Sequence, residues 1–497
     1  MRDAGYYGHR FVKRTWQAIL LGLLSAPVAL AQAGNWVAKA PMRTGRCCAA
    51  AAAIDGIVYV VGGFADSVGS LATLEAYDPA TNTWSEKAPM PTPRSYLAAA
   101  AVNGVLYAVG GENNLTGYVN TLEAYDPRTN LWTTKAPMPT ARMGLAAATV
   151  GGKLFAIGGD KPNALLATVE AYDPMTNSWA TMPPMPTARF YLAVASAFGS
   201  LYAVGGNDVA HGRINTLEVY EPTTGSWATG LPMPTPRDGL TAAVVGGDLY
   251  AIGGSDGGQY TTVEAYDPVT NSWMKAPSLS TGRHDLASAV VDDTIYAIGG
   301  LGYQCCIGSE PFLATNEAFS PFEMVKIDIK PGDPSNFINL KSNGVVPVAI
   351  LGSATFDPMT VDPASVTLTA ATDNGSGEPG GAPVATRGRG IPMTATADVN
   401  HDGYPDLFLY FRTEDMTVLA SAEHSSALQP PGDGETPPLQ SAGHRPALQQ
   451  MEAVLYGKTY SGTPIRGSDT VRIVPAPKPG PGRFNPRHGL LHPGFRR

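Results

Sequence analysis

The sequence predicts an all-β protein: a closed ring of six four-stranded sheets followed by a small β-sandwich-like domain. Three kinds of marker residue recur six times in register, which indicates a repeat architecture. Each period contains four short strand patterns separated by Gly, Pro or Asn turns. Charged residues make up only 15% of the chain and Gly plus Pro about 20%, a composition that disfavours long helices and coiled coils.

The repeat period is close to 48 residues. The marker tryptophans are separated by 48, 48, 47, 48 and 46 residues, and the other two markers keep the same spacings. The tryptophans are Trp36, Trp84, Trp132, Trp179, Trp227 and Trp273. The diglycines begin at Gly62, Gly110, Gly158, Gly205, Gly253 and Gly299. The arginines are Arg46, Arg94, Arg142, Arg189, Arg237 and Arg283.

The second unit shows the four strands in order. Residues 95–102 are small, which suits a crowded axis, and residues 104–111 form an apolar strand that ends in the diglycine. Residues 120–127 alternate apolar and polar side chains before a proline turn. Residues 130–139 centre on the tryptophan and end in prolines, which cannot donate to a ladder. Because one such sheet cannot bury both faces, neighbouring units must stack around an axis.

Each unit thus joins an arginine, a diglycine, a Tyr-Asp-Pro turn and a tryptophan. The full set stands at Arg94, Gly110-Gly111, Tyr125-Asp126-Pro127 and Trp132. This combination resembles the kelch repeat over about residues 35–322, and the resemblance implies a kelch β-propeller. Two units depart from the pattern: the fourth has Glu221 for the aspartate, and the sixth has Phe319 for the tyrosine and no tryptophan strand after it.

The missing strand of the sixth unit predicts how the ring closes. A tryptophan strand around Trp36 precedes the first arginine, so the tryptophan strands are offset by one from the other three strands. We expect Trp36 to lie in the outermost strand of the last blade, beside residues 315–320. That strand would cover the exposed edge of an open ring.

A second β domain is predicted over residues 323–475, after a propeller spanning residues 32–322. Strand patterns lie at residues 325–332, 336–342, 344–353, 364–371, 393–400 and 406–411, and a closing hairpin lies at 458–475. The Ile-Asp-Ile-Lys-Pro-Gly and Pro-Val-Ala-Ile-Leu-Gly motifs resemble a β-rich module appended to exported bacterial proteins. The resemblance implies no known activity.

The remaining segments indicate export. Residues 1–31 have a basic start, a short apolar run and small residues at Ala29 and Ala31, which predicts a cleaved secretory signal; an uncleaved anchor is the alternative. Residues 415–450 and 476–497 lack strand periodicity and predict a disordered insertion and a flexible tail. We expect a secreted, periplasmic or cell-surface protein without a membrane span in the mature chain. The net charge of -8 argues against a nucleic-acid binder.

Every unit also carries a glutamate at a fixed offset from its arginine. These are Glu75, Glu123, Glu170, Glu218, Glu264 and Glu317. We expect six structural ion pairs, each holding an inner strand against its neighbour. The alternative is a ring of arginines that binds an anion in the central channel.

The loops after the diglycines vary in length and polarity on a constant frame, as a recognition surface does. Strand alternation places them at the same end as the Pro-Met-Pro-Thr loops that begin the blades. The candidate binding residues are Asp66, Asn113, Asn114, Lys161, Asp208, His211, Asp256 and Tyr303. The alternative is that these loops are solvated turns.

The four cysteines form two adjacent pairs that ring closure brings to one seam. Cys47 and Cys48 begin the first inner strand, and Cys305 and Cys306 follow the last diglycine. We expect at least one disulfide between the two pairs. Bonds within each pair and reduced thiols are the alternatives, and a metal site is least favoured.

A second candidate site is an Asp-x-Asn-x-Asp-Gly loop in the β domain. Asp398, Asn400, Asp402 and Asp406 would supply side-chain oxygens to Ca²⁺, and Tyr404 its carbonyl. A full EF-hand would need an acid where Leu409 stands, so the loop is closer to the shorter calcium loops of integrin-type propellers. A metal-free turn is the alternative.

These features favour a non-enzymatic exported protein that binds a protein or a glycan and needs no organic cofactor. A carbohydrate-active enzyme, such as a sugar mutarotase or epimerase with Arg and Glu at the channel mouth, is the alternative. A third option is a cell-surface or matrix component attached through the β domain. Copper oxidases with kelch-type propellers need several metal ligands, but this propeller has only His211 and His284.

Overall fold

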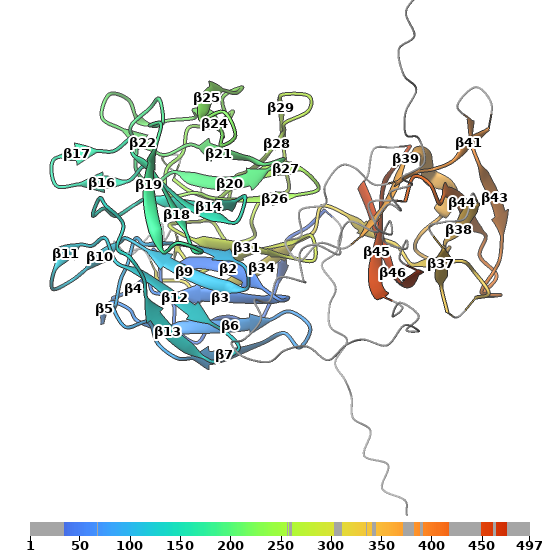
Figure 1. The fold of residues 1–497 in the computed structure, drawn as a ribbon, viewed down its shortest axis with the longest axis horizontal. Helices are drawn as coiled ribbons and strands as arrows, with labels where there is room; N and C mark the ends of the chain where they lie inside the picture. Colours follow the sequence, from blue (N-terminus) through green and yellow to red (C-terminus); the bar gives the residue numbers. More distant parts are fainter. Residues whose placement is uncertain are drawn as a thin grey trace, which may run out of the picture.

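The computed structural model describes residues 34–66, 68–255, 257, 261–302, 311–333, 335–339, 344–370, 382–387, 391–416, 449–460 and 464–474. They form two β domains, which lie side by side in Figure 1. Within the described residues, no helix has the length and apolar character needed to cross a membrane.

The first domain is a propeller of six antiparallel four-stranded sheets, each running from an inner strand at the axis to an outer strand. Blade I contains β2 (Ala50–Ile54), β3 (Ile57–Val61), β6 (Leu74–Asp78) and β7 (Thr83–Lys87). Blade II contains β8 (Ala98–Val102), β9 (Val105–Val109), β12 (Leu122–Asp126) and β13 (Leu131–Thr134). Blade III contains β14 (Ala146–Val150), β15 (Lys153–Ile157), β18 (Val169–Asp173) and β19 (Ser178–Met182).

The remaining blades repeat this order. Blade IV contains β20 (Ala193–Ala197), β21 (Ser200–Val204), β24 (Leu217–Glu221) and β25 (Ser226–Thr229). Blade V contains β26 (Thr241–Val245), β27 (Asp248–Ile252), β28 (Val263–Asp267) and β29 (Ser272–Lys275). Blade VI contains β31 (Ala287–Val291), β32 (Thr294–Ile298), β34 (Asn316–Phe319) and β1 (Val37–Ala38).

The N-terminal strand closes the ring, as the offset of the tryptophan strands predicts. In β1, Val37 pairs with Ala318 and Ala38 pairs with Glu317. Trp36 immediately precedes this strand, and its indole stacks on Phe319 with ring centroids 5.2 Å apart. The phenylalanine of the sixth unit therefore occupies the tyrosine position and packs against the tryptophan from the other end of the propeller chain.

Two sets of hydrogen bonds run all the way around the propeller. Each marker tryptophan donates its indole N–H to a backbone carbonyl just after the outer strand of the preceding blade. Trp84 donates to Ala40 (2.7 Å), and the set closes where Trp36 donates to Pro277 (2.8 Å). Each marker arginine accepts, on its backbone carbonyl, the N–H of the second glycine of the preceding blade. The set closes where Gly300 donates to Arg46 (2.9 Å).

The diglycines are needed because the backbones of neighbouring blades meet there. Gly62 has a φ of +64°, and a Cβ on it would lie 2.6 Å from the carbonyl oxygen of Arg94. Any larger residue would therefore separate blades I and II.

The propeller core lies in the gaps between blades. One aromatic pair from neighbouring blades occupies each gap, with ring centroids 5.5 to 6.3 Å apart. The pairs are Tyr59–Tyr125, Tyr107–Tyr172, Phe155–Tyr220, Tyr202–Tyr266, Tyr250–Phe319 and Tyr296–Tyr77. Each blade is thus stabilised by both of its neighbours, as expected of a closed repeat.

Short two-stranded hairpins follow the diglycines. They are β4 (Phe64–Ala65) with β5 (Gly69–Ser70), β10 (Glu112–Asn113) with β11 (Gly117–Tyr118), β16 (Asp160–Lys161) with β17 (Ala164–Leu165), and β22 (Asn207–Asp208) with β23 (Gly212–Arg213). In blade VI, β30 (Arg283–His284) pairs with β33 (Leu301–Gly302). We call the end of the propeller that carries these elements the hairpin face.

The second domain consists of two main sheets around one apolar core. The six-stranded sheet contains β35 (Glu323–Met324), β37 (Phe337–Asn339), β39 (Val361–Ala370), β40 (Ala382–Pro383), β45 (Gln449–Thr459) and β46 (Pro464–Val474). The four-stranded sheet contains β36 (Ile327–Ile329), β38 (Val345–Ile350), β43 (Thr394–Ala397) and β44 (Asp406–Arg412). A 3₁₀ turn, η1 (Pro358–Thr360), and a small pair, β41 (Thr386–Arg387) with β42 (Ile391–Pro392), complete the described part.

The closing hairpin is longer than the sequence pattern predicts. Strand β45 begins at Gln449, so it includes the last two residues of the expected insertion at 415–450 and pairs with β46 along its length. Residues 417–448 and 475–497, where the rest of the insertion and the tail are expected, lie outside the described residues, as do residues 1–33 with the expected signal.

The second domain contacts the propeller at the end opposite the hairpin face. Asp293, in the turn between β31 and β32, accepts a hydrogen bond from the Tyr456 hydroxyl (2.6 Å) and forms an ion pair with Arg466 (2.6 Å). The Phe322 ring packs against Tyr456, with centroids 5.5 Å apart. A buried charge pair and an aromatic contact therefore fix this junction.

Candidate functional site

The six arginines are structural residues inside the blades. Each forms an ion pair with the glutamate of its own blade: Arg46–Glu75 (2.6 Å), Arg94–Glu123 (2.7 Å), Arg142–Glu170 (3.1 Å), Arg189–Glu218 (3.0 Å), Arg237–Glu264 (2.9 Å) and Arg283–Glu317. All six arginine side chains are 0% exposed. The guanidinium of Arg94 also donates to the carbonyls of Gly110 (2.9 Å) and Thr121 (3.0 Å). The side chain of each arginine thus joins strands of its own blade. Its backbone carbonyl joins that blade to the preceding one.

Burial also affects the charge of these arginines. It lowers the pKa of Arg142 and Arg189 to about 10, while the neighbouring glutamates act in the opposite direction. Both remain cationic at neutral pH, so both pairs stay ionic. Because the pairs are buried, neither the arginines nor the glutamates reach a ligand in the channel.

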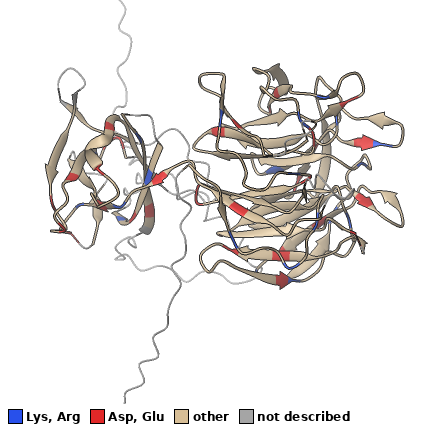
Figure 2. Ribbon diagram, turned by 180° about the vertical axis from the view of Figure 1, so that it is seen from behind, with Lys and Arg blue, Asp and Glu red and all other residues tan. Residues whose placement is uncertain are grey.

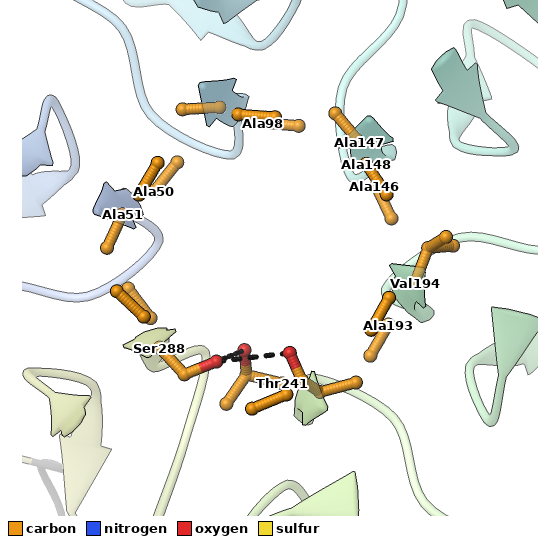
Figure 3. A pocket seen from close by; sticks show the side chains of 18 of the residues that line it. Ala50, Ala51, Ala98, Ala146, Ala147, Ala148, Ala193, Val194, Thr241 and Ser288 are labelled. Carbon is orange, nitrogen blue, oxygen red and sulfur yellow. Dashed lines mark hydrogen bonds between the residues drawn. The ribbon is translucent and has the colours of Figure 1, made fainter. Parts of the chain in front are cut away.

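The central channel is a cavity of about 380 Å³ lined by the six inner strands. Alanine is the commonest lining residue, and none of the described lining residues is Arg or Glu. Figure 3 shows that side chains such as Ala50 and Ala51 lie along the wall rather than across the lumen. Each inner strand is the edge of its sheet, so its outer backbone edge faces the channel. Thr241 and Ser288 add a hydroxyl pair 2.7 Å apart.

A second backbone ring closes around the channel at the hairpin face. It consists of the residues two positions after each arginine: Cys48, Tyr96, Gly144, Tyr191, Gly239 and Asp285. We call it the mouth ring. Each N–H donates to the carbonyl of the preceding member at 2.7 to 3.0 Å, and the ring closes where Cys48 donates to Asp285. All six residues have φ between +51° and +60°, a region that favours glycine.

The mouth ring has different chemistry on its two sides. The Tyr96 and Tyr191 rings lie 5.5 Å apart, and Tyr191 lies over Gly144. The Asp285 carboxylate lies over Gly239, and its Oδ2 is 3.0 Å from Nδ1 of His284. A pocket of about 90 Å³ is lined by the mouth ring and by the residue that follows each ring member in the sequence. Five of these six following residues are leucines.

Burial is the main cause of the shifted pKa values of the thiol and the two phenols in the mouth ring. It raises the pKa of Cys48 well above its ordinary value, and hydrogen bonding with Cys47 and the charge of Asp285 add to the shift. It also raises the pKa of Tyr96 and Tyr191, with Cys48 contributing for Tyr96 and Asp285 for Tyr191. The thiol and both phenols are therefore neutral at physiological pH, next to one carboxylate.

The candidate residues of the hairpins have different roles. Lys161 is exposed and lines a groove between the second and third hairpins, whereas Asp66 is exposed at the tip of the first. Asn113 is buried: it donates to Pro93 (2.7 Å) and accepts from Leu115 (2.9 Å), so it shapes its own turn. Asn114 accepts from Ser70 (2.9 Å) of the neighbouring hairpin.

The fourth hairpin contains an ordered polar group. Asp208 accepts the backbone N–H of His211 (2.6 Å) and contacts its imidazole (2.9 Å). Arg213 donates to Asp238 (3.1 Å) at the start of the next blade. The two remaining candidates, Asp256 and Tyr303, lie outside the described residues.

The cysteine seam is described on one side only. Cys47 and Cys48 are buried and form no disulfide with another described residue. Phe64, which pairs with Cys47, packs against Phe312, so the seam lies beside the segment that leads out of the last diglycine loop. Cys305 and Cys306 lie outside the described residues, and the disulfide stays a prediction.

The expected calcium loop divides into exposed and buried groups. Asp398 accepts the N–H groups of Asp402 (3.1 Å) and Gly403 (3.0 Å), and the Asn400 amide donates to Asp402 (2.9 Å). Asp406 instead is buried, and its two oxygens accept from Gly352 (2.8 Å) and Val399 (2.7 Å). Across the described residues, no three His, Cys, Asp or Glu side chains are gathered as for a metal ion.

Sequence reasoning missed the mouth ring. It selected Cys48 only as a disulfide candidate and did not select Tyr96, Tyr191 or Asp285. The signal was present in the repeats: the position two residues after the arginine is occupied by four residue types, although the arginine is constant. Asking which repeat positions vary beside the axis would have found it.

Comparison with known families agrees with the repeat and the blades. The model described as the KLHDC2/KLHL20/DRC7 Kelch-repeats domain matches residues 34–185 and 134–300. No curated protein was found to match the chain. The matched residues include more than half of the chain, and kelch propellers are generally protein-binding scaffolds. The chain therefore belongs to the kelch-repeat family and carries a β-rich domain after its propeller.

Proposed function

We propose that this protein binds a protein partner through the hairpin face. The observation that carries the proposal is a set of apolar side chains at the tips of three hairpins. Val68, Leu115 and Val209 are 66%, 93% and 86% exposed. An apolar side chain held at a hairpin tip on a rigid frame is well placed to enter a partner's surface.

A groove beside one of these tips supports the proposal. It lies between the second and third hairpins, next to Leu115, and contains both apolar and charged groups. Its described lining includes Thr116, Tyr118, Pro139, Thr140, Lys161 and Pro162. The Tyr118 hydroxyl donates to Asp160 (3.2 Å), which joins the two hairpins across the groove.

The position of the second domain also supports the hairpin face as the binding surface. The second domain lies at the end of the propeller opposite the hairpins (Figure 1). Its contacts there involve Phe322, Tyr456 and Arg466. Among the described residues, the second domain therefore covers part of the other end and makes no contact with the hairpin face.

The enzyme alternative relied on the arginines and glutamates that recur in the repeats. A sugar isomerase was expected to use arginine and glutamate at the channel mouth, but these side chains are buried in ion pairs. Glycan recognition by the hairpins stays an outcome of the experiment below.

Site-specific photo-crosslinking tests the proposal. A photoreactive amino acid at Leu115 or Val209 should capture a partner from the native extracellular fraction, whereas the same group at Met175 or Val269 should not. Met175 and Val269 are matched controls, because they are 87% and 83% exposed in turns at the opposite end. The captured protein should then bind the purified chain, and the double variant Leu115→Ser/Val209→Ser should weaken binding about tenfold or more. Adducts formed mainly from Met175, or binding to a glycan array alone, would contradict the proposal.

We also propose that the chain is exported and that the loop at Asp398, Asn400 and Asp402 binds Ca²⁺ together with the Tyr404 carbonyl. The three side chains lie on one exposed loop, which suits a hard cation. N-terminal sequencing of protein from the producing cell should begin at residue 32. Calcium at a hundredfold excess over Kd should stabilise the chain by about 2.7 kcal/mol, and Asp402→Ala should remove that gain. If calorimetry at millimolar calcium showed no heat of binding, the loop would be an ordinary turn without a calcium site.

A further inference from the structure

The side chains of the mouth ring are held at a conformational cost. Cys48, Tyr96, Tyr191 and Asp285 all have φ between +51° and +58°, where a side chain costs about 1–2 kcal/mol. The backbone ring does not require them, because Gly144 and Gly239 make the same hydrogen bonds. Strained residues that the local fold does not need are typical of functional sites.

The side chains of the mouth ring carry polar groups, whereas apolar side chains would be enough to fill the channel mouth. Two neutral phenols stand near the Asp285 carboxylate, whose charge adds to the raised pKa of Tyr191 and, to a smaller extent, of Cys48 and Tyr96. The carboxylate therefore acts across the mouth. None of the described residues that line the mouth pocket is a lysine or an arginine, and the basic side chain beside Asp285 is the His284 imidazole, 3.0 Å from its Oδ2.

The surrounding hairpin face carries further negative charge. Its acidic residues include Asp66, Glu112, Asp160, Asp208 and Asp238, and Figure 2 shows acidic segments on the hairpins. On the four hairpins from β4 to β23, Lys161 and Arg213 are the basic residues of the described strands, and Arg283 on β30 is buried and paired with Glu317. Arg213 is already bound to Asp238. A cationic group approaching from this side would be attracted toward the mouth.

We infer that the mouth ring binds an organic cation, and that its natural ligand is a lysine side chain of the protein partner. The ammonium would pair with Asp285 and lie against the rings of Tyr96 and Tyr191, whose π faces and hydroxyl oxygens both attract cations. The pocket of about 90 Å³ has the volume of about three waters, which suits the end of a side chain rather than a sugar ring.

The ligand assignment deepens the proposed function, so its test uses a probe that needs no partner. We would measure binding of n-butylammonium to the full chain by saturation-transfer NMR and calorimetry at pH 8, where a histidine is ordinarily neutral. The neutral n-butanol and the anionic n-butyrate are matched controls for shape. The expected result is binding of n-butylammonium and no detectable binding of the other two.

Variants locate the site. Asp285→Asn keeps the shape of the side chain and should weaken n-butylammonium binding about tenfold or more. Tyr191→Leu should weaken it severalfold, whereas Tyr191→Phe, which keeps the ring, should have a smaller effect. Asp55→Asn is the control, because Asp55 is an exposed acid with positive φ in the turn between β2 and β3 at the far end of blade I.

Each outcome decides the matter. Equal binding of n-butanol, no binding of n-butylammonium, or equal losses in Asp285→Asn and Asp55→Asn would overturn the inference. If Asp285→Asn did not fold, the comparison of the three probes on the unchanged chain would still decide it. If the unchanged chain did not bind n-butylammonium but the photoreactive group at Leu115 still captured a partner, this inference would be refuted and the proposed function would remain.

Discussion

The arginine position and the mouth-ring position are separated by one residue in every blade, yet they differ in how far the residue type varies. The six arginines are identical, fully buried and paired with the same glutamate position. The mouth ring keeps an identical backbone geometry but carries cysteine, tyrosine, glycine and aspartate side chains. In this repeat protein, framework positions repeat in residue type, whereas the mouth-ring positions repeat only in backbone conformation.

The largest expected effect comes from opening the ring that holds both positions. Deleting residues 32–42 removes β1 and Trp36, and leaves the edge of β34 and the stacked face of Phe319 exposed. The melting temperature should fall by more than 10 °C, because more than one buried contact is lost. Differential scanning calorimetry measures it, and deletion of residues 476–497 serves as the control. An unchanged melt would contradict closure by β1.

Breaking one framework pair should have the next largest effect. Arg94→Met removes the guanidinium but leaves Glu123 buried without its partner, which costs about 3–5 kcal/mol. The double variant Arg94→Met/Glu123→Leu should recover most of this loss, since no uncompensated charge remains. Urea denaturation measures both. A double variant as unstable as the single one would mean that the backbone contacts of Arg94, rather than its charge, dominate.

The junction between the domains provides an intermediate test. Asp293→Asn keeps the side-chain shape but leaves Arg466 without its buried carboxylate. We expect the free energy of unfolding to fall by about 2–4 kcal/mol and the segment around residue 322 to become sensitive to protease. Limited proteolysis followed by mass spectrometry detects the cleavage. Equal resistance in both proteins would show that Phe322 and Tyr456 are sufficient to hold the domains.

The smallest effect concerns pH. Burial and the nearby Asp267 raise the pKa of Asp248 to about 6, so the folded chain holds a proton more tightly than the unfolded chain. The stabilisation is complete below about pH 4 and is lost as the pH rises through about 6. Asp248→Asn should therefore stabilise the protein by about 1 kcal/mol at pH 8 and have little effect at pH 4. Urea denaturation of both proteins at pH 4 and pH 8 measures the difference, and an equal effect at the two pH values would contradict it.

The fold could be predicted from the sequence because its signals are periodic. Trp36 and its five counterparts fixed the number of blades, and the tryptophan strand preceding Arg46 indicated the closure that β1 makes. The second domain followed from strand patterns alone, but β45 was shorter in the prediction because no turn signal marked its start at Gln449.

The site was harder to predict because its residues become neighbours only through the ring. Tyr96 and Tyr191 are two blades apart in sequence and meet across Gly144. Asp285 reaches Cys48 only because the first and last blades join. Asn113 and Asp406 were selected for their polarity, but both are buried. Asn113 donates to the carbonyl of Pro93, and Asp406 accepts the N–H of Gly352.

The central claim is that the side chains of the mouth ring serve ligand binding rather than the fold. The most direct measurement is a comparison of stability and binding in a variant with glycine at Cys48, Tyr96, Tyr191 and Asp285. Glycine relieves about 1–2 kcal/mol of strain at each position, which offsets the lost burial. We predict a melting temperature within about 5 °C of the unchanged protein and no binding of n-butylammonium. Collapse of the fold, or retained binding of the cation, would contradict the account.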